Sequence, residues 1–193
     1  MKEVGLFFGS FNPVHIGHLI IANYCVEFTE LEEVWFVPSP QNPLKKREDL
    51  ASPEVRLQML KIALEDRHPK IKLCLDELQL PTPSYTHQTI EHLQQKYPEL
   101  NFTLILGDDS LRSLHRWKNY TNIVQQVKLM VYPRRNNITD PQYPFNIPYN
   151  QVNAPLIDIS STQIRTWLAN HYDVRMFLPK EVYEYIIQNN LYQ

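Results

Sequence analysis

The most constraining feature of this sequence is an apolar run that leads directly into a glycine turn and a pair of histidines. The run Val4-Gly5-Leu6-Phe7-Phe8 is typical of a strand that is buried on both faces of a parallel sheet. Beyond Gly9, apolar residues recur at helical spacing, at Ile16, Leu19, Ile20 and Val26. The segment therefore predicts a strand, a tight turn at Gly9, and a helix that begins near Pro13 to His15, with Pro13 tolerated in its first turn.

Strand-like and helix-like patterns alternate along the rest of the chain. Short apolar runs predict further strands at 33–37, 71–75, 101–106, 128–132 and 154–159. Helical spacing predicts helices around Ile90 and Leu93 and at 53–64, 120–126, 162–170 and 179–189, with a helical or irregular segment at 112–117. This alternation predicts an α/β fold, a doubly wound Rossmann-like parallel sheet with helices on both faces.

Polar residues at two helix starts predict how these helices begin. Ser52 precedes Pro53 and Glu54, a pattern that predicts a serine N-cap, a proline at the first position and an acidic first turn. Either Ser84 or Thr86 is expected to cap the helix that follows them.

The composition indicates one domain, 1–193, with a helical C-terminal part from about residue 160. Of the 193 residues 43% are hydrophobic, which is enough to bury a core. The net charge of −2 argues against a nucleic-acid partner, and no apolar run approaches the roughly 20 residues that span a membrane. Cys25 and Cys74 have no metal-ligand spacing and favour a cytoplasmic location. The oligomeric state stays open, a homo-oligomer included, and 133–155 is expected to form a loop over the site.

His15 and His18 lie three residues apart, so both imidazoles are expected on one side of the first helical turn. The N-terminus of a helix is already electropositive, and a cation there is disfavoured by up to about 1 kcal/mol. An anion at the same place removes this cost, because free N–H groups and imidazoles then point at it together. The pair therefore predicts a phosphate site. The alternative is one surface histidine and one histidine that only ends a helix.

A second candidate anion site begins with Ser160, Ser161 and Thr162, three consecutive hydroxyls at the start of a predicted helix. Arg165 follows in about the first turn, again where a cation is unfavourable unless an anion is bound. Helix capping alone explains one serine and is the alternative interpretation. If the two helix starts meet at the crevice of the sheet, they would hold one polyphosphate from both sides.

Other candidates follow predicted strands, because open α/β sheets bind ligands beyond the carboxyl ends of their strands. Gly107 closes the fourth strand and allows close backbone approach, while Asp109 beside it suits a ribose hydroxyl or a metal. Lys45 belongs to a basic triplet after the second strand, for which a solvated surface loop is the alternative. Arg134 follows the fifth strand.

Two motifs carry a resemblance to a known superfamily. The stretch from Gly9 to His18, G-S-F-N-P-V-H-I-G-H, resembles the H-x-G-H signature of the nucleotidyltransferases, which include class I aminoacyl-tRNA synthetases and small adenylyltransferases. Its G-x-F-x-P-x-H-x-G-H form resembles the small adenylyltransferases in particular. The segment 159–165, I-S-S-T-x-I-R, is similar to the C-terminal phosphate motif of the same enzymes.

Further matches narrow the resemblance to bacterial nicotinate-nucleotide adenylyltransferases. These are P-S-Y-T at 83–86, L-G-D-D-S-L at 106–111, and Trp117. The resemblance extends from about residue 4 to the C-terminus, apart from 133–155.

The resemblance implies a nucleotidyltransferase-type fold and a set of site residues. It implies ATP binding by Gly9, Ser10, Phe11, His15, Gly17, His18, Gly107, Asp109, Ser160, Ser161, Thr162 and Arg165. Of these, His15, His18 and Arg165 are expected to act in catalysis. It implies binding of nicotinate mononucleotide by Lys45, Tyr85, Thr86, Trp117 and Arg134. Thr86 would hydrogen bond to the nicotinate ring and Trp117 would stack on it. No protein ligand is assigned to a metal, and Mg²⁺ is expected to accompany ATP, held largely by phosphates and water.

Three positions depart from the family's pattern. Ser10 stands where threonine is frequent, which is a minor change. Asn12 stands where aspartate is common, which removes a carboxylate near the phosphates and bears on metal placement. Leu44 stands where a histidine usually precedes the basic residue, so contact of that loop with the substrate phosphate would depend on Lys45.

The implied reaction is attack of the 5′-phosphate of nicotinate mononucleotide on the α-phosphorus of ATP, with release of pyrophosphate. The substrate is itself the nucleophile, so catalysis consists of positioning and charge stabilisation. One alternative is another small adenylyl- or cytidylyltransferase, such as the phosphopantetheine enzyme, which Trp117 and 83–86 argue against. Another is a nucleotide-sensing module without activity, supported only by Asn12. A synthetase-like RNA-binding role is disfavoured, because the sequence shows neither an anticodon-type domain nor an excess of basic residues.

Overall fold

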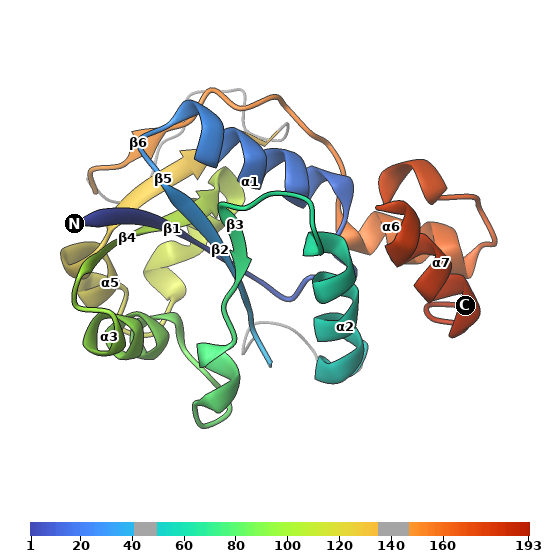
Figure 1. Cartoon of the computed structure of the whole chain (residues 1–193), viewed down its shortest axis with the longest axis horizontal. Helices are drawn as coiled ribbons and strands as arrows, with labels where there is room; N and C mark the ends of the chain where they lie inside the picture. Colours follow the sequence, from blue (N-terminus) through green and yellow to red (C-terminus); the bar gives the residue numbers. More distant parts are fainter. Residues whose placement is uncertain (41–49, 135–146) are drawn as a thin grey trace.

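The computed structural model describes residues 1–40, 50–134 and 147–193. They form a six-stranded sheet in the order β3-β2-β1-β4-β5-β6, in which every neighbouring pair is parallel (Figure 1). The strands are β1 (Lys2–Gly9), β2 (Glu33–Pro38), β3 (Ile71–Leu73), β4 (Leu100–Gly107), β5 (Lys128–Tyr132) and β6 (Asn150–Gln151). This is the strand order of the doubly wound nucleotide-binding sheet, so the predicted fold class is confirmed.

Helices connect the strands and cover the sheet. They are α1 (Ile16–Phe28), α2 (Pro53–Leu64), α3 (Thr86–Lys96), α4 (Asp108–Ser113), α5 (Tyr120–Gln126), α6 (Ser161–Ala169) and α7 (Lys180–Gln188). Short 3₁₀ segments lie at η2 (Asp76–Gln79), η3 (Leu114–Arg116) and η5 (Arg175–Phe177). None of the helices in the described parts of the chain is both long and apolar enough to cross a membrane.

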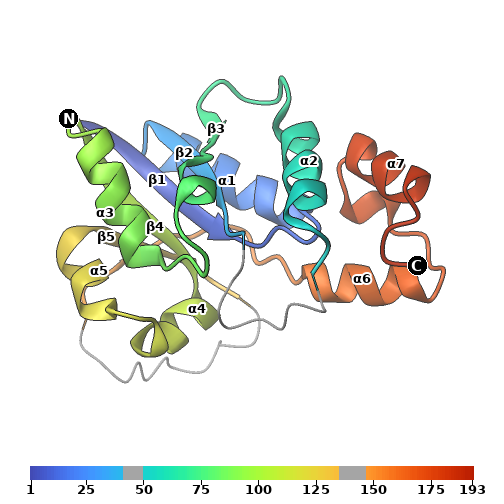
Figure 2. The same cartoon turned by 90° about the horizontal axis from the view of Figure 1, so that it is seen from below.

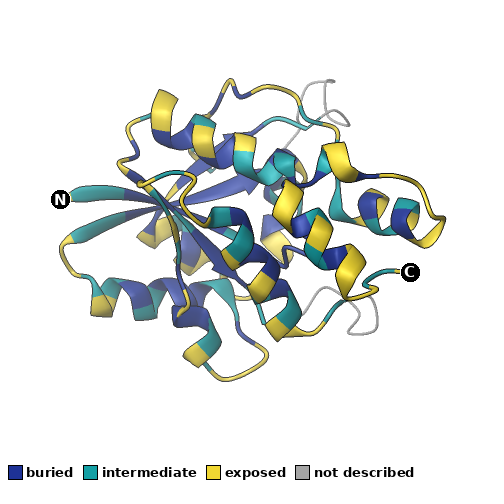
Figure 3. Ribbon diagram, turned by 45° about the vertical axis from the view of Figure 1, so that its right-hand side comes forward, coloured by how far each residue is buried: buried dark blue, intermediate teal, exposed yellow. Residues whose placement is uncertain are grey.

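Each face of the sheet carries its own hydrophobic core, because successive side chains of a strand point to opposite faces. Phe7 and Ile105 pack on one face with side chains of α1, α2, α6 and α7. Leu6 and Leu104 pack on the other face with Ile90 of α3 and with residues of α5. Figure 1 shows α1 on one side of the sheet and α3 and α5 on the other, and Figure 3 shows the strands buried between exposed outer helix surfaces.

The two C-terminal helices lie at the end of the molecule away from the N-terminus (Figure 2). There α7 contacts α2, and α6 begins beside the loop that follows β1. This arrangement brings the C-terminal hydroxyl motif to the same place as the N-terminal histidine motif, although most of the chain separates them in sequence.

The strand predicted at 154–159 is wrong. The sixth strand consists of Asn150 and Gln151 alone, which pair with Met130 and Val131, and 152–160 has no regular structure. The pairing is short because β6 lies at the edge of the sheet and Pro155 has no N–H to donate. The region 133–155 therefore contains this short strand and is not entirely a loop, while 135–146 lies outside the described residues.

Several helix starts differ from the predictions. Tyr85 is the N-cap of α3, because the Ser84 hydroxyl donates to the Glu77 carboxylate and Thr86 is already the first helical residue. Pro13 precedes α1, whose N-cap is His15, and α4 begins directly at Asp108 instead of near 112. The predicted Ser52 N-cap is confirmed: its hydroxyl accepts from the Val55 N–H at 3.3 Å.

Candidate functional site

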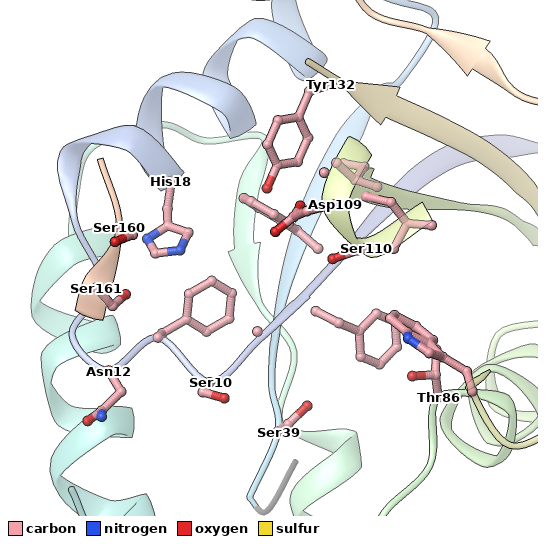
Figure 4. A pocket seen from close by; sticks show the side chains of 18 of the residues that line it. Ser10, Asn12, His18, Ser39, Thr86, Asp109, Ser110, Tyr132, Ser160 and Ser161 are labelled. Atoms are coloured by element: carbon pink, nitrogen blue, oxygen red, sulfur yellow. The ribbon is translucent and has the colours of Figure 1, made fainter. Parts of the chain in front are cut away.

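A cavity of about 590 Å³ opens at the carboxyl ends of β1 and β4. These two strands are neighbours at the point where the strand order reverses, which is where doubly wound sheets bind their ligands. Figure 4 shows His18 and Ser160 on one side of the cavity and Thr86 on the other. Of the predicted site residues, those that line it are Gly9, Ser10, Phe11, His15, His18, Tyr85, Thr86, Gly107, Asp109, Trp117, Arg134, Ser160, Ser161, Thr162 and Arg165.

Two predicted residues are not among those that line this cavity. Gly17 lines a much smaller neighbouring cavity together with His15 and His18. A Cβ at Gly17 would lie 3.0 Å from the His15 ring, so the glycine allows that ring to pack against the helix backbone. Lys45 lies outside the described residues, as does Leu44.

The two motifs lie beside each other and are joined by direct hydrogen bonds. The Ser161 hydroxyl donates to the Pro13 carbonyl at 2.9 Å, and Arg165 Nη1 donates to the Asn12 carbonyl at 2.9 Å. Ser160 forms a capping box with Gln163, in which the Gln163 N–H donates to the serine hydroxyl and the Ser160 N–H donates to Gln163 Oε1. The N-terminal ends of α1 and α6 are thereby held beside one cavity.

The two imidazoles of the N-terminal motif lie against each other, with ring centroids 3.7 Å apart and ring planes tilted by 30°. His18 Nδ1 accepts a hydrogen bond from the His15 N–H at 3.2 Å. A neutral imidazole has one donor and one acceptor nitrogen, so this bond leaves the proton on His18 Nε2. His18 lines the cavity, and its Nε2–H is the polar group that it can direct at an anion there.

His15 carries no positive charge at neutral pH. Its side chain is 3% exposed, and burial, with a smaller contribution from the Arg134 charge, lowers the pKa of His15 to about 3. The sequence pattern predicts two potential cations at the helix start, His15 and His18. In the structure, His15 is a neutral imidazole. This arrangement avoids placing two like charges at the positive end of the α1 dipole.

This depressed pKa predicts that stability falls on mild acidification. The unfolded chain protonates His15 near pH 6.5 and the folded chain only near pH 3, so the unfolded state binds more protons between these values and is favoured as the pH falls through that window. Between pH 7 and pH 5 the wild type is expected to lose about 2 kcal/mol of unfolding free energy more than His15→Asn. Urea denaturation of both proteins at several pH values measures this difference. Parallel stability curves would contradict it.

Phe11 has a backbone φ of 45°, a left-handed conformation that is uncommon for a bulky residue. Its ring is 2% exposed and packs edge-on against the His18 ring, with centroids 5.2 Å apart. A Cβ on Gly9 would lie 2.8 Å from this ring, which explains the glycine at the turn. The unusual backbone therefore places an aromatic support under His18.

Two side chains lie close to Gly107 at the end of β4. A Cβ on Gly107 would lie 2.5 Å from Asp109 Oδ1 and 3.1 Å from the Tyr132 hydroxyl. Arg134 Nη1 donates to Asp109 Oδ2 at 3.4 Å, so the residues after β4 and β5 are joined at the cavity rim. The Asp109 side chain is still 55% exposed and accessible to a ligand.

Arg56 supports the cavity from α2, and sequence reasoning missed it. The side chain is 2% exposed, and its guanidinium donates to the carbonyls of Ser10 at 2.8 Å, Ser39 at 2.8 Å, Pro40 at 2.6 Å and Ala51 at 3.1 Å. It thus ties the loop after β1 to the end of β2. An arginine in a surface helix is ordinarily solvated, so no local pattern distinguishes this one.

Glu77 was missed for a similar reason. Its carboxylate is 2% exposed and accepts from the Ser84 hydroxyl at 2.7 Å and from the Thr89 hydroxyl at 3.1 Å. Burial raises the pKa of Glu77 above its usual value. The carboxylate fixes the segment that carries Tyr85 and Thr86 into the cavity wall.

The Asn12 side chain is engaged by the fold. Its Oδ1 accepts from the Ala51 N–H at 3.1 Å and from the Tyr192 hydroxyl at 2.6 Å. Figure 4 shows the side chain directed away from His18. The amide oxygen thus performs a structural task that a carboxylate oxygen could perform as well.

The chain is similar in sequence to known proteins over nearly its whole length. The family model described as cytidylyltransferase-like matches residues 6–167. The chain is 45% identical over 192 residues to a Flavobacterium psychrophilum protein named "Probable nicotinate-nucleotide adenylyltransferase", with 99% of each chain covered. A Bacteroides fragilis protein of the same name is 44% identical over 187 residues, covering 96% of this chain and 92% of that protein.

The fold also has a close counterpart among solved structures. The Plasmodium falciparum nicotinic acid mononucleotide adenylyltransferase complexed with NaAD superimposes with a TM-score of 0.84, covering 100% of this chain and 98% of that one. The sequence identity is 22%, so this comparison bears on the fold alone.

Proposed function

The chain belongs to the cytidylyltransferase-like family and, within it, to the nicotinate-nucleotide adenylyltransferases, and from this premise we propose how its cavity performs their reaction. It is an adenylyltransferase of NAD biosynthesis, which transfers AMP from ATP to nicotinate mononucleotide and gives deamido-NAD and pyrophosphate. In this reaction a phosphate oxygen of the mononucleotide forms a bond to the α-phosphorus of ATP. The bond from that phosphorus to the bridging oxygen breaks, and pyrophosphate leaves with its electron pair.

The observation that carries the proposal is a single cavity with two different ends. One end holds His18, Thr162, Arg165 and the start of α6, which suits a chain of phosphates. The hydroxyls of Ser160 and Ser161 donate to Gln163 Oε1 and to the Pro13 carbonyl, so these two residues hold the start of α6 in place. The other end holds Tyr85, Thr86 and Trp117, which suit a flat aromatic ring. A substrate ring at one end and a triphosphate at the other would bring the two reacting phosphates together between them.

We assign charge stabilisation to the phosphate end. His18 Nε2–H donates to the oxygens on which charge develops, and His15 holds the His18 ring through its backbone N–H and the contact of its neutral ring. Arg165 is anchored to the Asn12 carbonyl through Nη1 and is oriented to bind the outer phosphates. Asp109, just after β4, accepts from a ribose hydroxyl, and Gly107 lines the same part of the cavity.

Magnesium enters this proposal as part of the substrate Mg-ATP. Among the described residues, no group of three or more histidine, cysteine, aspartate or glutamate side chains is arranged to hold a metal. The hydroxyls and backbone groups around the cavity suit an ion that keeps most of its contacts with phosphates and water.

Product identification tests the proposed function. Incubation with Mg-ATP and nicotinate mononucleotide is expected to yield deamido-NAD and pyrophosphate in equal amounts, identified by liquid chromatography with mass spectrometry. Chelation of the divalent metal is expected to stop the reaction, and added Mg²⁺ to restore it. ATP hydrolysis without a dinucleotide product would refute the assignment.

The alternatives are weaker on this geometry. A phosphopantetheine adenylyltransferase has no evident use for Trp117 beside Thr86 in the cavity wall. A sensing module without activity depended on Asn12, whose side-chain oxygen is engaged by Ala51 and Tyr192. We also propose a cytoplasmic enzyme that acts on small nucleotides, supported by the unpaired thiols of Cys25 and Cys74.

A further inference from the structure

Two segments that line the ring end of the cavity contact each other in and behind its wall. One is 84–87 at the start of α3, and the other is 116–119, which runs from the last residue of η3 to the N-cap of α5. Asn119 Nδ2 donates to His87 Nε2 at 3.1 Å. Lys118 Nζ lies 4.2 Å from the centroid of the Tyr85 ring. Figure 2 shows the helices that carry these segments, α3 and α5, side by side.

These contacts bracket the two residues assigned to the ring. Thr86 lies between Tyr85 and His87 in sequence, and Trp117 directly precedes Lys118. We call Tyr85, His87, Lys118 and Asn119 the ring clamp. Any widening of the gap between Thr86 and Trp117 would stretch its hydrogen bond.

A histidine at position 87 costs stability if it serves only to fill space. Its side chain is 5% exposed, and its Nδ1 has no hydrogen-bond partner in the described parts of the chain. An apolar side chain of similar size would avoid a buried polar atom without a partner. The bond of Nε2 to Asn119 is therefore the property that histidine adds at this position.

Asn119 also gives up an ordinary local hydrogen bond in favour of the bond to His87. It is the N-cap residue of α5, where an asparagine side chain usually accepts from the first turn of the helix, yet it makes no such cap bond. Its φ of 52° lies in the left-handed region, which asparagine tolerates better than most residues. The side chain is directed to His87 instead of to its own helix.

We propose that His87 and Asn119 are positioning residues that fix the spacing between Thr86 and Trp117 before the substrate enters. This inference rests on the proposed function, because it assumes that the nicotinate ring binds between those two residues. A gap of fixed width costs less ordering on binding than one that must first assemble. The clamp should therefore govern the affinity for nicotinate mononucleotide and leave the affinity for ATP unchanged, since the phosphate end is built from other elements.

The test compares four variants by initial-rate kinetics with each substrate varied in turn. His87→Leu keeps bulk but removes the acceptor, and His87→Gln keeps an acceptor near the position of Nε2. Asn119→Gly keeps the left-handed backbone and removes the donor. The control is His92→Leu, because His92 lies on the same helix and pairs with Asp76 at 3.2 Å, away from the cavity.

We expect His87→Leu and Asn119→Gly to raise the KM for nicotinate mononucleotide about 3- to 10-fold, the loss of one ordinary hydrogen bond. The KM for ATP should change less than twofold, His87→Gln should restore most of the loss, and His92→Leu should change neither constant. An equal rise in both KM values, or equal behaviour of His87→Gln and His87→Leu, would overturn the proposal. If His87→Leu fails to fold, Asn119→Gly alone decides it.

Calorimetric titration with nicotinate mononucleotide separates this inference from the proposed function. Absence of turnover by the wild type would refute the function. The clamp would still be supported if the variants bound this ligand more weakly than the wild type did, and it would be refuted if all bound it equally.

Discussion

His18→Ala is expected to lower the turnover number about 10²- to 10³-fold while the protein remains folded. The magnitude is that of removing one donor that faces developing charge in a site sheltered from water. The change also removes the acceptor for the His15 N–H, which is 3.2 Å from His18 Nδ1. That loss should cost only about 1 kcal/mol of stability, because one ordinary hydrogen bond is lost. Initial rates and thermal unfolding measure the two effects separately.

Two further variants separate the two nitrogens of His18. Asparagine places an oxygen near the position of Nδ1 and can still accept from the His15 N–H. Glutamine places an amide N–H near the position of Nε2. We expect His18→Gln to retain more activity than His18→Asn, although His18→Asn keeps the helix start better. Equal activity of the two, or near wild-type activity of His18→Ala, would remove Nε2 from the mechanism.

Arg56→Met is expected to produce the largest loss of stability, about 3 kcal/mol. Methionine fills much of the space but leaves the carbonyls of Ser10, Ser39, Pro40 and Ala51 without their donor. Because three of these carbonyls, those of Ser10, Ser39 and Pro40, belong to the loops after β1 and β2, the KM for ATP should rise as well. Urea denaturation measures the loss of stability, and the m value should stay unchanged. Kinetics on the folded protein then measure the KM for ATP.

The matched control for this prediction is Arg67→Met. Arg67 pairs with Glu181, and both side chains are about half exposed, at 42% and 53%. Exposed pairs of this kind contribute about 0 to 1 kcal/mol. Equal losses for the two arginine variants would mean that the buried hydrogen bonds of Arg56 do not stabilise the cavity loops.

Local patterns predicted most of the fold and located the two phosphate motifs, but that the motifs meet was only a condition of the predicted polyphosphate site. The apolar runs and the helical spacing are local signals, and the topology rule for parallel sheets then brings strand ends to one edge. The prediction of a strand at 154–159 was wrong although the segment is apolar, because the chain there lies at the sheet edge and Pro155 has no N–H to donate. The prediction that Ser84 caps α3 was wrong because its hydroxyl donates to Glu77 instead. Glu77 lies outside the short capping pattern on which that prediction was based.

The remaining site features depend on burial, which the sequence does not show. His15 is neutral only because it is 3% exposed. In the sequence, Arg56 and Glu77 resemble ordinary surface charges. Only the structure shows that Arg56 binds buried carbonyls and that Glu77 binds buried hydroxyls. The link from Asn119 to His87 joins two helices that no spacing rule relates.

The most direct test of the account is pyrophosphate release with Mg-ATP and each of three acceptors in parallel: nicotinate mononucleotide, nicotinamide mononucleotide and phosphopantetheine. We expect the fastest release with nicotinate mononucleotide and none with phosphopantetheine, because Thr86 and Trp117 provide a site for a flat ring. Release with phosphopantetheine alone would keep the phosphate end and refute the ring end. No release with any acceptor would contradict the central claim that this cavity transfers AMP.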